Sequence, residues 1–360
     1  MDNQIEARKK LYYDLSIRLA CVDTKQLTEL AGGEGARGWG RSQTIDIDTS
    51  KVFVKRIPVT QLEYENMFST ENIFNIPAIY HYGVGSAGFS AFRELAAHVK
   101  TTNWVLDGDI ANFPLMYHYR IVPNFTVASE PDAEQHAGYV KYWNSDPGID
   151  RYMLARHAAG HEMILCLEHF PHALNNWLTT NQDKAEVVTA EMLQTIGFLR
   201  EHGILHFDAH LANIVVNGDT PYLTDFGLVL DRNFAIAGDE RAFFELHADY
   251  DLVTFLTRIA GHVYVIFGGL PSEEKKKAAE VCGLSDDAGF IDTMTALIVN
   301  VETLHDGRLM NLDTGYVGLV VKYRDIALTL LRFYQGLLEN DRKDTPYPHS
   351  EFRRLLDASR

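Results

Sequence analysis

The stretch between residues 204 and 230 contains four polar side chains whose types and spacing suit a chemical function. His206, Asp208 and Asn213 follow one short apolar run, and Asp225 follows another. The residues between them alternate around an Asn-Gly-Asp turn, which predicts a β-hairpin that returns Asp225 to the same cleft. Two carboxylates and an amide placed in this way could hold magnesium ions and orient a hydroxyl nucleophile, which are the requirements of phosphoryl transfer.

Two features nearer the N-terminus suit the same chemistry. In Gly33-x-Gly35-x-x-Gly38 the missing side chains would let backbone N–H groups close over phosphates, and Lys55 follows 17 residues after Gly38 on a short strand-like run. Taken alone, such glycines more often form surface turns, and a lysine on an apolar strand usually extends its ammonium group to solvent. Their combined spacing favours a phosphate-binding loop followed by a phosphate-binding lysine.

The pattern His206-x-Asp208-x-x-x-x-Asn213, followed by Asp225-Phe226-Gly227, resembles the protein-kinase-like superfamily, of the bacterial Ser/Thr protein kinase type. The resemblance covers roughly residues 32–260. It implies that ATP and Mg²⁺ are the cofactors, that Asp208 is the base or hydroxyl-orienting group, and that Asn213 and Asp225 are metal ligands. Lys55 looks like the kinase lysine that binds the α- and β-phosphates.

The resemblance also requires a glutamate that pairs with Lys55 and holds it against the phosphates. Glu94 lies on the best-defined helix before the fourth strand, but 39 residues after Lys55, so that an insertion must separate strand and helix. Glu63 and Glu65 are nearer, on a short and poorly periodic helix. Glu94 is the preferred candidate, and for all three a solvent-exposed salt bridge is the alternative explanation.

The apolar run 161–170 resembles the strand and connecting segment between the two lobes of a kinase. This likeness implies that backbone groups of Glu168 and Phe170 hydrogen-bond the adenine of ATP. A core strand followed by an amphipathic helix would give the same pattern.

Four departures from the family pattern bear on regulation and substrate. Phe207 stands where regulated protein kinases carry an arginine that reads a phosphorylated loop, and residues 227–248 contain no Ser, Thr or Tyr. We therefore expect no activating phosphorylation in that segment. No A-P-E motif follows, and His210 stands where Ser/Thr protein kinases usually place a lysine, which is similar to aminoglycoside and choline kinases.

The sequence therefore leaves two classes of acceptor for the phosphoryl group, a protein and a small molecule. The setting of Asp225-Phe226-Gly227 favours Ser or Thr of a protein, whereas His210 favours a small molecule such as a sugar, choline or an aminoglycoside. A non-catalytic kinase-like scaffold is a third hypothesis, but such scaffolds commonly lack at least one of Lys55, Asp208, Asn213 and Asp225. The expected activity is that of an ATP- and magnesium-dependent kinase acting on an alcohol group.

Composition narrows the partners and the compartment. A formal net charge of -16 argues against nucleic acid as a partner. The N-terminus lacks the apolar stretch of a signal peptide, and no apolar run approaches the ~20 residues of a membrane-spanning helix. Three widely separated cysteines suggest neither disulfides nor a zinc site. We expect a cytoplasmic protein without a membrane partner.

The elements read from the sequence give an α+β, bilobal, protein-kinase-like fold with a small antiparallel sheet lobe and a larger, mainly helical lobe. Runs 51–57, 76–85 and 161–170 read as strands, and 90–106 and 185–204 as amphipathic helices. Ser90 can cap the first helix, and each helix has one apolar face: Phe92, Leu95, Ala96 and Val99 in the first, and Val188, Met192, Ile196 and Leu199 in the second. The expected divisions are a helical extension (1–31), an N-lobe (32–169) with a surface insertion near 123–150, a C-lobe (170–345) and a surface tail (346–360).

Overall fold

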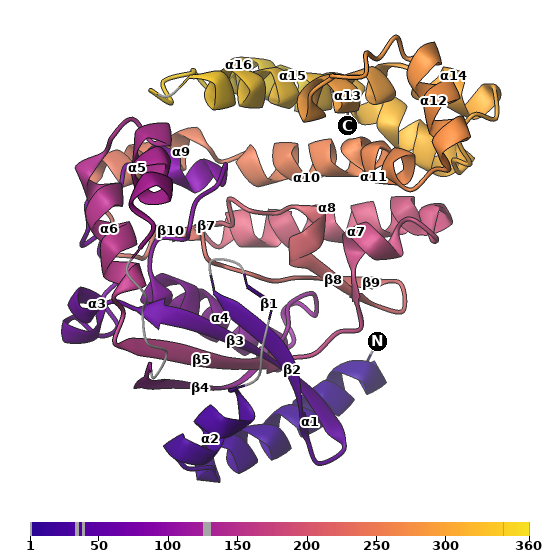
Figure 1. The fold of residues 1–360 in the computed structure, drawn as a ribbon. Coiled ribbons are helices and arrows are strands. Elements are labelled where there is room, and N and C mark those ends of the chain that lie inside the picture. Colours follow the sequence, from indigo (N-terminus) through magenta and orange to yellow (C-terminus); the bar gives the residue numbers. More distant parts are fainter. Residues whose placement is uncertain (1, 33–35, 38–39, 125–130, 341, 360) are drawn as a thin grey trace. The chain divides into compact units, whose positions relative to one another are not determined.

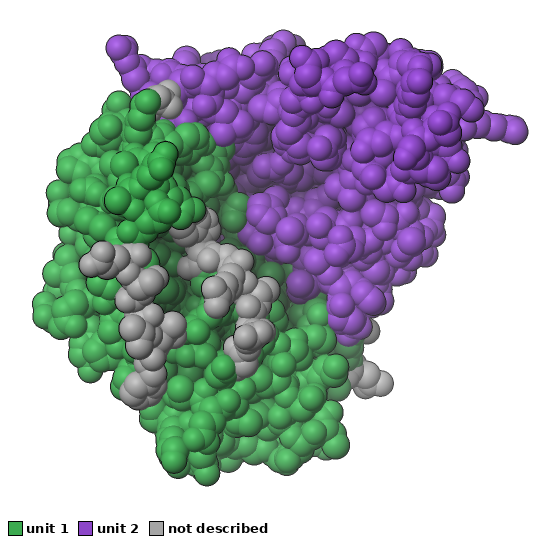
Figure 2. All heavy atoms as spheres, in the orientation of Figure 1, with its two compact units in different colours: residues 1–170, 206–208, 222–244 green, residues 171–205, 209–221, 245–360 purple. Residues whose placement is uncertain are grey.

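The computed structural model of the chain describes residues 2–32, 36–37, 40–124, 131–340 and 342–359. The chain forms two compact units, coloured separately in Figure 2. Unit 1 comprises residues 1–170, 206–208 and 222–244, and unit 2 comprises residues 171–205, 209–221 and 245–360. The α+β class is confirmed: an N-terminal antiparallel sheet is followed by a largely helical C-terminal region (Figure 1).

Unit 1 is built on an antiparallel sheet. Its strands, in spatial order, are β1 (Ala36–Arg37), β2 (Arg41–Ile47), β3 (Ser50–Val59), β5 (His161–Glu168) and β4 (Met116–Pro123). Successive side chains of a strand point to opposite faces. Along β3, Ile57 and Val59 therefore point to the same face as Lys55, whereas the fully buried Val52 and Val54 point to the other.

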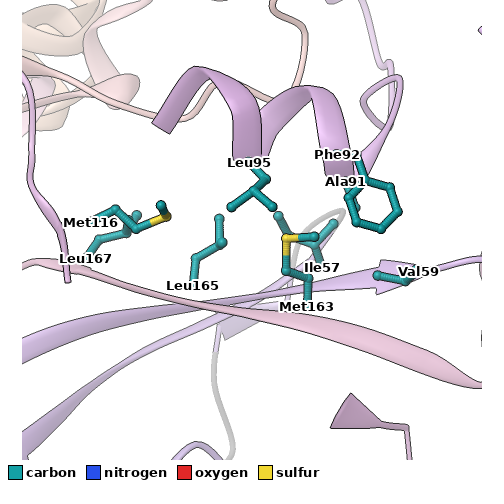
Figure 3. Close-up of a cluster of buried hydrophobic side chains, with 9 residues drawn as sticks. All are labelled: Ile57, Val59, Ala91, Phe92, Leu95, Met116, Met163, Leu165 and Leu167. Atoms are coloured by element: carbon teal, nitrogen blue, oxygen red, sulfur yellow. The ribbon is translucent and has the colours of Figure 1, made fainter. Parts of the chain in front are cut away.

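Helix α4 (Ala91–Asp107) covers the face of the sheet to which Lys55 points. Ser90 caps its first turn by accepting a hydrogen bond from Phe92 N–H, as predicted. Apolar side chains of α4, β3, β4 and β5 form the core between helix and sheet (Figure 3): Ile57, Val59, Ala91, Phe92, Leu95, Met116, Met163, Leu165 and Leu167. Val99 is 39% exposed, so its assignment to the buried stripe was wrong.

The buried stripe of α4 differs from the predicted one because it includes polar residues. His98, Thr101 and Thr102 are buried, and Thr102 accepts a hydrogen bond from Met116 N–H at 2.9 Å. An apolar periodicity cannot detect buried positions whose side chains are polar, such as the hydrogen-bonded Thr101 and Thr102.

The N-terminal extension is helical, as predicted. It forms α1 (Asp2–Cys21) and α2 (Thr24–Leu30), and Asp23 caps α2 in a capping box with Gln26. Leu15, Leu19 and Leu27 are buried, and Arg56 of β3 donates to Ala31 O. Because Arg56 points to the face opposite Lys55, the extension covers that second face of the sheet.

Two parts of unit 1 differ from the expectation. The run 76–85 is not a strand: it contains the 3₁₀ helix η1 (Ala78–Tyr82), which ends at Gly83 with φ of +73°. Residues 123–150 are not wholly a surface insertion, since α5 (Ala133–Tyr142) is followed by the buried Trp143, and Tyr152 of α6 (Pro147–His157) is also buried. The Trp143 ring lies 4.7 Å from that of Tyr80, and this contact outweighs the polar composition of the segment. The short helix α3 (Gln61–Glu65) completes this part.

Unit 2 is mainly helical. Its helices are α7 (Leu174–Trp177), α8 (Ala185–Glu201), α10 (Tyr250–Gly261), α11 (Val263–Gly268), α12 (Ser272–Val281), α13 (Phe290–Val299), α14 (Val301–Asp306), α15 (Thr314–Glu339) and α16 (His349–Ala358). Helix α9 (Gly238–Leu246) begins in unit 1. The face predicted for α8 is confirmed, because Val188, Met192, Ile196 and Leu199 are all buried. Its chain leaves through Gly203, with φ of +75°.

Short strands and 3₁₀ turns connect these helices. They are β6 (His172–Ala173), η2 (Gln182–Lys184), β7 (Ile204–Leu205), η3 (Leu211–Asn213), β8 (Ile214–Asn217), β9 (Thr220–Leu223) and β10 (Leu230–Asp231). Strands β8 and β9 are neighbours in one small sheet, joined through Gly218 with φ of +61°. The predicted hairpin that leads towards Asp225 is thus confirmed.

Two expectations for the C-terminal region need correction. Among the described residues, Tyr250–Gly268 is one stretch of 19 residues with mean hydropathy 1.2, long and apolar enough to span a membrane, although 67% of it is buried inside the protein. Its helices belong to the core of unit 2. The expected surface tail contains α16, whose Phe352 is buried against Tyr347 at a ring distance of 4.9 Å.

Candidate functional site

The ammonium group of Lys55 is the centre of a buried charge cluster in unit 1. Its Nζ donates to Glu94 Oε1 at 2.6 Å and to Asp225 Oδ1 at 2.7 Å. The side chains of Lys55, Glu94 and Asp225 are 16%, 5% and 40% exposed. Three residues that are far apart in the sequence, on β3, on α4 and after β9, thus form one network with one side open to solvent.

Glu94, and neither of the two nearer glutamates, is the partner of Lys55 on a helix. Glu63 is buried and serves as a structural cap, because its carboxylate accepts from Thr60 N–H and from Ala91 N–H at the start of α4. Glu65 accepts from Gln61 at the surface. The long separation between Lys55 and Glu94 is filled by α3, η1 and their connections.

Asp225 is held in an uncommon backbone conformation. Its φ is +65°, and its Oδ1 also accepts from Gly227 N–H at 3.4 Å. Gly227 O accepts from Phe89 N–H at 3.1 Å, and the buried Phe226 ring meets that of His98 edge-on at 5.0 Å. Non-glycine residues in this region of φ are strained, and such strain is concentrated at functional sites.

The segment 206–208 belongs to the same unit and shows a second strained residue. The imidazole of His206 is fully buried: its Nε2 donates to Thr224 O at 3.0 Å, and its Nδ1 accepts from Asp208 N–H at 3.2 Å. Both ring nitrogens thus bond the backbone, as expected for a structural histidine. Phe207 has a φ of +62°. A Cβ at Gly83 would lie 3.3 Å from Asp208 Oδ1, so this glycine leaves room for the carboxylate.

The charges of the cluster stabilise one another. Burial alone would lower the pKa of Lys55, but the carboxylates of Asp225 and Glu94 raise it above its ordinary value. Burial disfavours the carboxylate forms too, yet Lys55 lowers the pKa of Asp225 to about 2. The pKa of Glu94 is also lowered, against the effect of burial, by Lys55 and by His98. All three groups are therefore ionised at neutral pH.

A second ion pair, which the sequence did not reveal, fixes the helix that carries Glu94. Arg93 is 1% exposed and Glu240 of α9 is 0% exposed; their two hydrogen bonds measure 2.7 and 3.2 Å. The guanidinium also lies over the ring of Phe234 at 5.6 Å. Two turns further along α4, Lys100 pairs with the buried Asp231. Helix α4 and residues 231–240 are thus joined by two buried carboxylates.

Contacts between aromatic rings add to the ion pairs that hold this part of unit 1 together. The ring of Phe207 lies 5.5 Å from that of Phe243 of α9 and 4.9 Å from that of His81. His81 Nδ1 donates to Leu228 O at 2.8 Å, and its ring stacks on Phe89 at 3.8 Å. The position that the family resemblance associates with a phosphate-reading arginine therefore belongs to an aromatic cluster.

The two residues expected to contact adenine lie at the end of β5. The N–H of Glu168 donates to Leu115 O at 2.8 Å, so this donor belongs to the sheet and is not available to a base. The carboxylate of Glu168 forms an ion pair with Arg8 of α1. Phe170 stacks on Tyr222 of β9, with ring centroids 4.1 Å apart. Any adenine contact in this segment must therefore use other backbone groups.

The other predicted site residues are three glycines, Asn213 and Asp208. Gly33, Gly35 and Gly38 are outside the described residues. Asn213 belongs to unit 2, where it ends η3 and its N–H donates to His210 O at 2.9 Å. Two hydrogen bonds of Lys55 bring it together with Glu94 and Asp225, and Asp208 belongs to the same unit.

The donor set fits a magnesium ion that is held mainly by a ligand. Within the described part of the chain, no three His, Cys, Asp or Glu side chains gather as a metal site. Mg²⁺ at a phosphate site usually needs only one or two protein carboxylates, with phosphates and water as its other ligands. Asp225 meets this requirement because it is ionised and 40% exposed.

Comparison with known proteins leaves the interpretation to this geometry: no protein-family model and no curated protein matches the chain. What the arrangement can do chemically follows from its parts. A fixed ammonium group beside a partly exposed, ionised carboxylate can bind a phosphate chain and its counter-ion.

Proposed function

We propose that the protein is an ATP- and Mg²⁺-dependent phosphotransferase that moves the γ-phosphate of ATP to a hydroxyl group. The proposal is carried by one observation: Lys55 Nζ hydrogen-bonds both Glu94 and Asp225, at 2.6 and 2.7 Å. A lysine fixed by a helical glutamate, next to the aspartate of an Asp-Phe-Gly sequence, is the arrangement expected of a kinase-like phosphate site. In this proposal the α+β architecture is the two-lobed, protein-kinase-like fold.

Each residue of the cluster has a role in the proposed reaction. Lys55 binds the α- and β-phosphates, and Glu94 holds its ammonium group in place. Asp225 is a ligand of Mg²⁺, which when bound would neutralise charge on the phosphates. Asp208 orients the acceptor hydroxyl and takes its proton, and Asn213 supplies a further metal-binding oxygen.

The preferred acceptor is Ser or Thr of a protein, and a small molecule is the alternative. His210 favours the alternative, because its place in the loop is similar to that in aminoglycoside and choline kinases. Labelled ATP added to the protein together with a cell lysate would distinguish them: label in the protein fraction supports a protein acceptor, and label in the metabolite fraction supports a small molecule.

The anchorage of residues 227–244 supports the hypothesis that this segment needs no phosphorylation. The segment contains no Ser, Thr or Tyr, and buried Glu240 and Asp231 already pair with cations of α4. A carboxylate in each pair supplies the negative charge that a phosphate group would otherwise bring.

Replacing Asp225 by Asn tests the proposed function. We expect metal-dependent ATP turnover to fall by about 10²–10³, the usual effect of losing one preorganised charge in an active site. Asp219→Asn is the matched control, because Asp219 is 55% exposed and pairs with the surface cation Lys184 at 3.6 Å. Undiminished turnover in Asp225→Asn would discard the assignment, whereas wild-type protein that neither binds nor turns over ATP would favour a scaffold.

A further inference from the structure

Arg8 of the N-terminal helix α1 is buried at the end of the central sheet. Its Nε and Nη2 donate to the two carboxylate oxygens of Glu168 at 2.9 and 2.8 Å. Its Nη1 and Nη2 donate to Ala111 O and Phe113 O at 2.7 and 2.6 Å. The side chain is 8% exposed, so this is a bidentate ion pair with two further hydrogen bonds in a largely dry site.

Arg8 also connects this site with the strand that leads to Asp225. Its guanidinium lies 5.0 Å from the ring centroid of Tyr222 on β9, and Gln4, one helical turn away, donates to Tyr222 Oη at 3.4 Å. Phe170 stacks on the same tyrosine ring. One face of α1 thus contacts the end of β5, the backbone at Ala111 and Phe113, and Tyr222, three residues before Asp225.

The register of the sheet shows how far this point lies from the charge cluster. Lys55 pairs with Leu165, and Val52 pairs with Glu168. Three residues of an antiparallel strand span about 10 Å. This distance matches that between the phosphates and the base of a nucleotide lying along the sheet, so that the end of β5 is the part of the site where the base would lie.

We propose that Arg8 is a positioning residue for the nucleotide base, and that α1 is therefore part of the nucleotide site. This inference rests on the proposed function. Arg8 fixes the carboxylate of Glu168, which in turn accepts from Leu115 N–H at 3.1 Å, and so it sets the path of the backbone at residues 168–170. Lys55 and Asp225 are fixed independently, by each other and by Glu94.

The consequence is a selective effect on affinity. A change at Arg8 displaces backbone groups that would contact the base, but leaves the phosphate-binding groups in place. Lysine cannot replace this arginine, because a single ammonium group cannot reach a carboxylate in bidentate fashion together with two carbonyl groups. Binding of ATP should weaken, and binding of a phosphate chain without a base should not.

The test compares Mg²⁺-ATP with Mg²⁺-tripolyphosphate by calorimetry, in the full-length wild type, Arg8→Lys and Arg8→Met. We expect the Kd for Mg²⁺-ATP to rise about tenfold in both variants, equivalent to about 1.4 kcal/mol, and the Kd for Mg²⁺-tripolyphosphate to stay within about twofold. Arg18→Lys and Arg18→Met are the matched controls on the same helix, since Arg18 is 48% exposed and pairs at the surface with Asp14.

The outcomes distinguish a failure of the positioning role of Arg8 from a failure of the proposed function. A weaker affinity for ATP alone, in an Arg8→Lys variant whose unfolding temperature resembles that of the wild type, supports the positioning role. Unchanged ATP affinity in a folded Arg8 variant, or an equal loss for both ligands, overturns that role and leaves the proposed function intact. Wild-type protein that binds neither ligand overturns both.

Discussion

At the scale of single residues, the site depends on a lysine shared between two carboxylates. Asp225 is partly exposed and Glu94 is not, so the two anions differ in purpose: the buried one fixes the cation, and the exposed one can contact a ligand. Sequence reasoning identified Lys55 and Asp225 because their types and spacing resemble a known motif, and Glu94 because it lies on the best-defined helix before the fourth strand. It missed Arg8, Arg93 and His98, because a buried charged or polar residue leaves no periodic signal, and its partner lies far away in the sequence.

The Lys55→Met variant tests the mutual stabilisation of these charges. Without the ammonium group, burial is opposed only by His206 and by the hydrogen bond from Gly227 N–H, and the pKa of Asp225 should rise from about 2 towards its ordinary value of 3.8. The folded-state pKa of Asp225 is depressed in the wild type, so its stabilising contribution is complete above pH 3.8 and is lost as the pH falls towards 2. Carbon NMR of Asp-labelled protein, with Asp225→Asn for assignment, measures the shift.

The matched control is Lys51→Met on the same strand, whose side chain is exposed. We expect the Asp225 signal to titrate there as in the wild type. An Asp225 pKa that stays near 2 in Lys55→Met would contradict the assigned cause of the shift. The difference in unfolding free energy between wild type and Lys55→Met should likewise narrow as the pH falls from 4 towards 2.

At the scale of elements, local sequence signals were sufficient to predict a helix and its buried face where one side of that helix is apolar. The start of α4 at Ser90 and the buried face of α8 follow from capping and periodicity. These signals gave wrong predictions where tertiary contacts determine the secondary structure or the burial of a segment. The run 76–85 has strand-like residues but folds as η1, in which Tyr80 and His81 are fully buried, and Trp143 is buried within a segment of polar composition.

The ion pair between Arg93 and Glu240 provides a test of how α4 is held. Glu240→Ala leaves the Arg93 guanidinium buried without its carboxylate, and we expect a loss of about 3–5 kcal/mol in the free energy of unfolding. In the double variant Arg93→Met/Glu240→Met, apolar side chains fill the same space, and most of that loss should be recovered. Urea unfolding measures both.

Turnover separates the structural role of this pair from a role in aligning Glu94. If the pair aligns α4, the double variant should remain less active than the wild type although its stability is restored. Glu245→Ala is the control, because Glu245 is exposed on the same helix. Full activity in the double variant would mean that the ion pair contributes to stability and not to the alignment of Glu94.

At the scale of the whole molecule, the elements read from the sequence predicted an α+β protein of two lobes, and the structure has this class and two compact units. The helical extension at the N-terminus was also predicted, but its relation to the sheet was not. That relation depends on Arg8, Arg56 and Arg120, whose partners are carboxylates or carbonyl groups more than twenty residues away. Such long-range pairs follow from strand order and register, which a single sequence does not specify.

Ligand-dependent stability offers a test of the whole proposal that needs no acceptor. A ligand that binds only the folded state stabilises it by about 2.7 kcal/mol at 100 times its Kd, which should raise the unfolding temperature by about 3–5 °C. We expect this shift with ATP and Mg²⁺ together. AMP with Mg²⁺ should produce a smaller shift, because it lacks the β- and γ-phosphates that Lys55 and the Asp225-bound ion would contact. In Lys55→Met the difference between the shifts with ATP and with AMP should become smaller, because the ammonium contact to the phosphates is lost, whereas in Lys51→Met it should stay as in the wild type. Equal shifts with ATP and AMP in the wild type would mean that the cluster around Lys55 does not bind a phosphate chain, and the proposed chemistry would lose its physical basis.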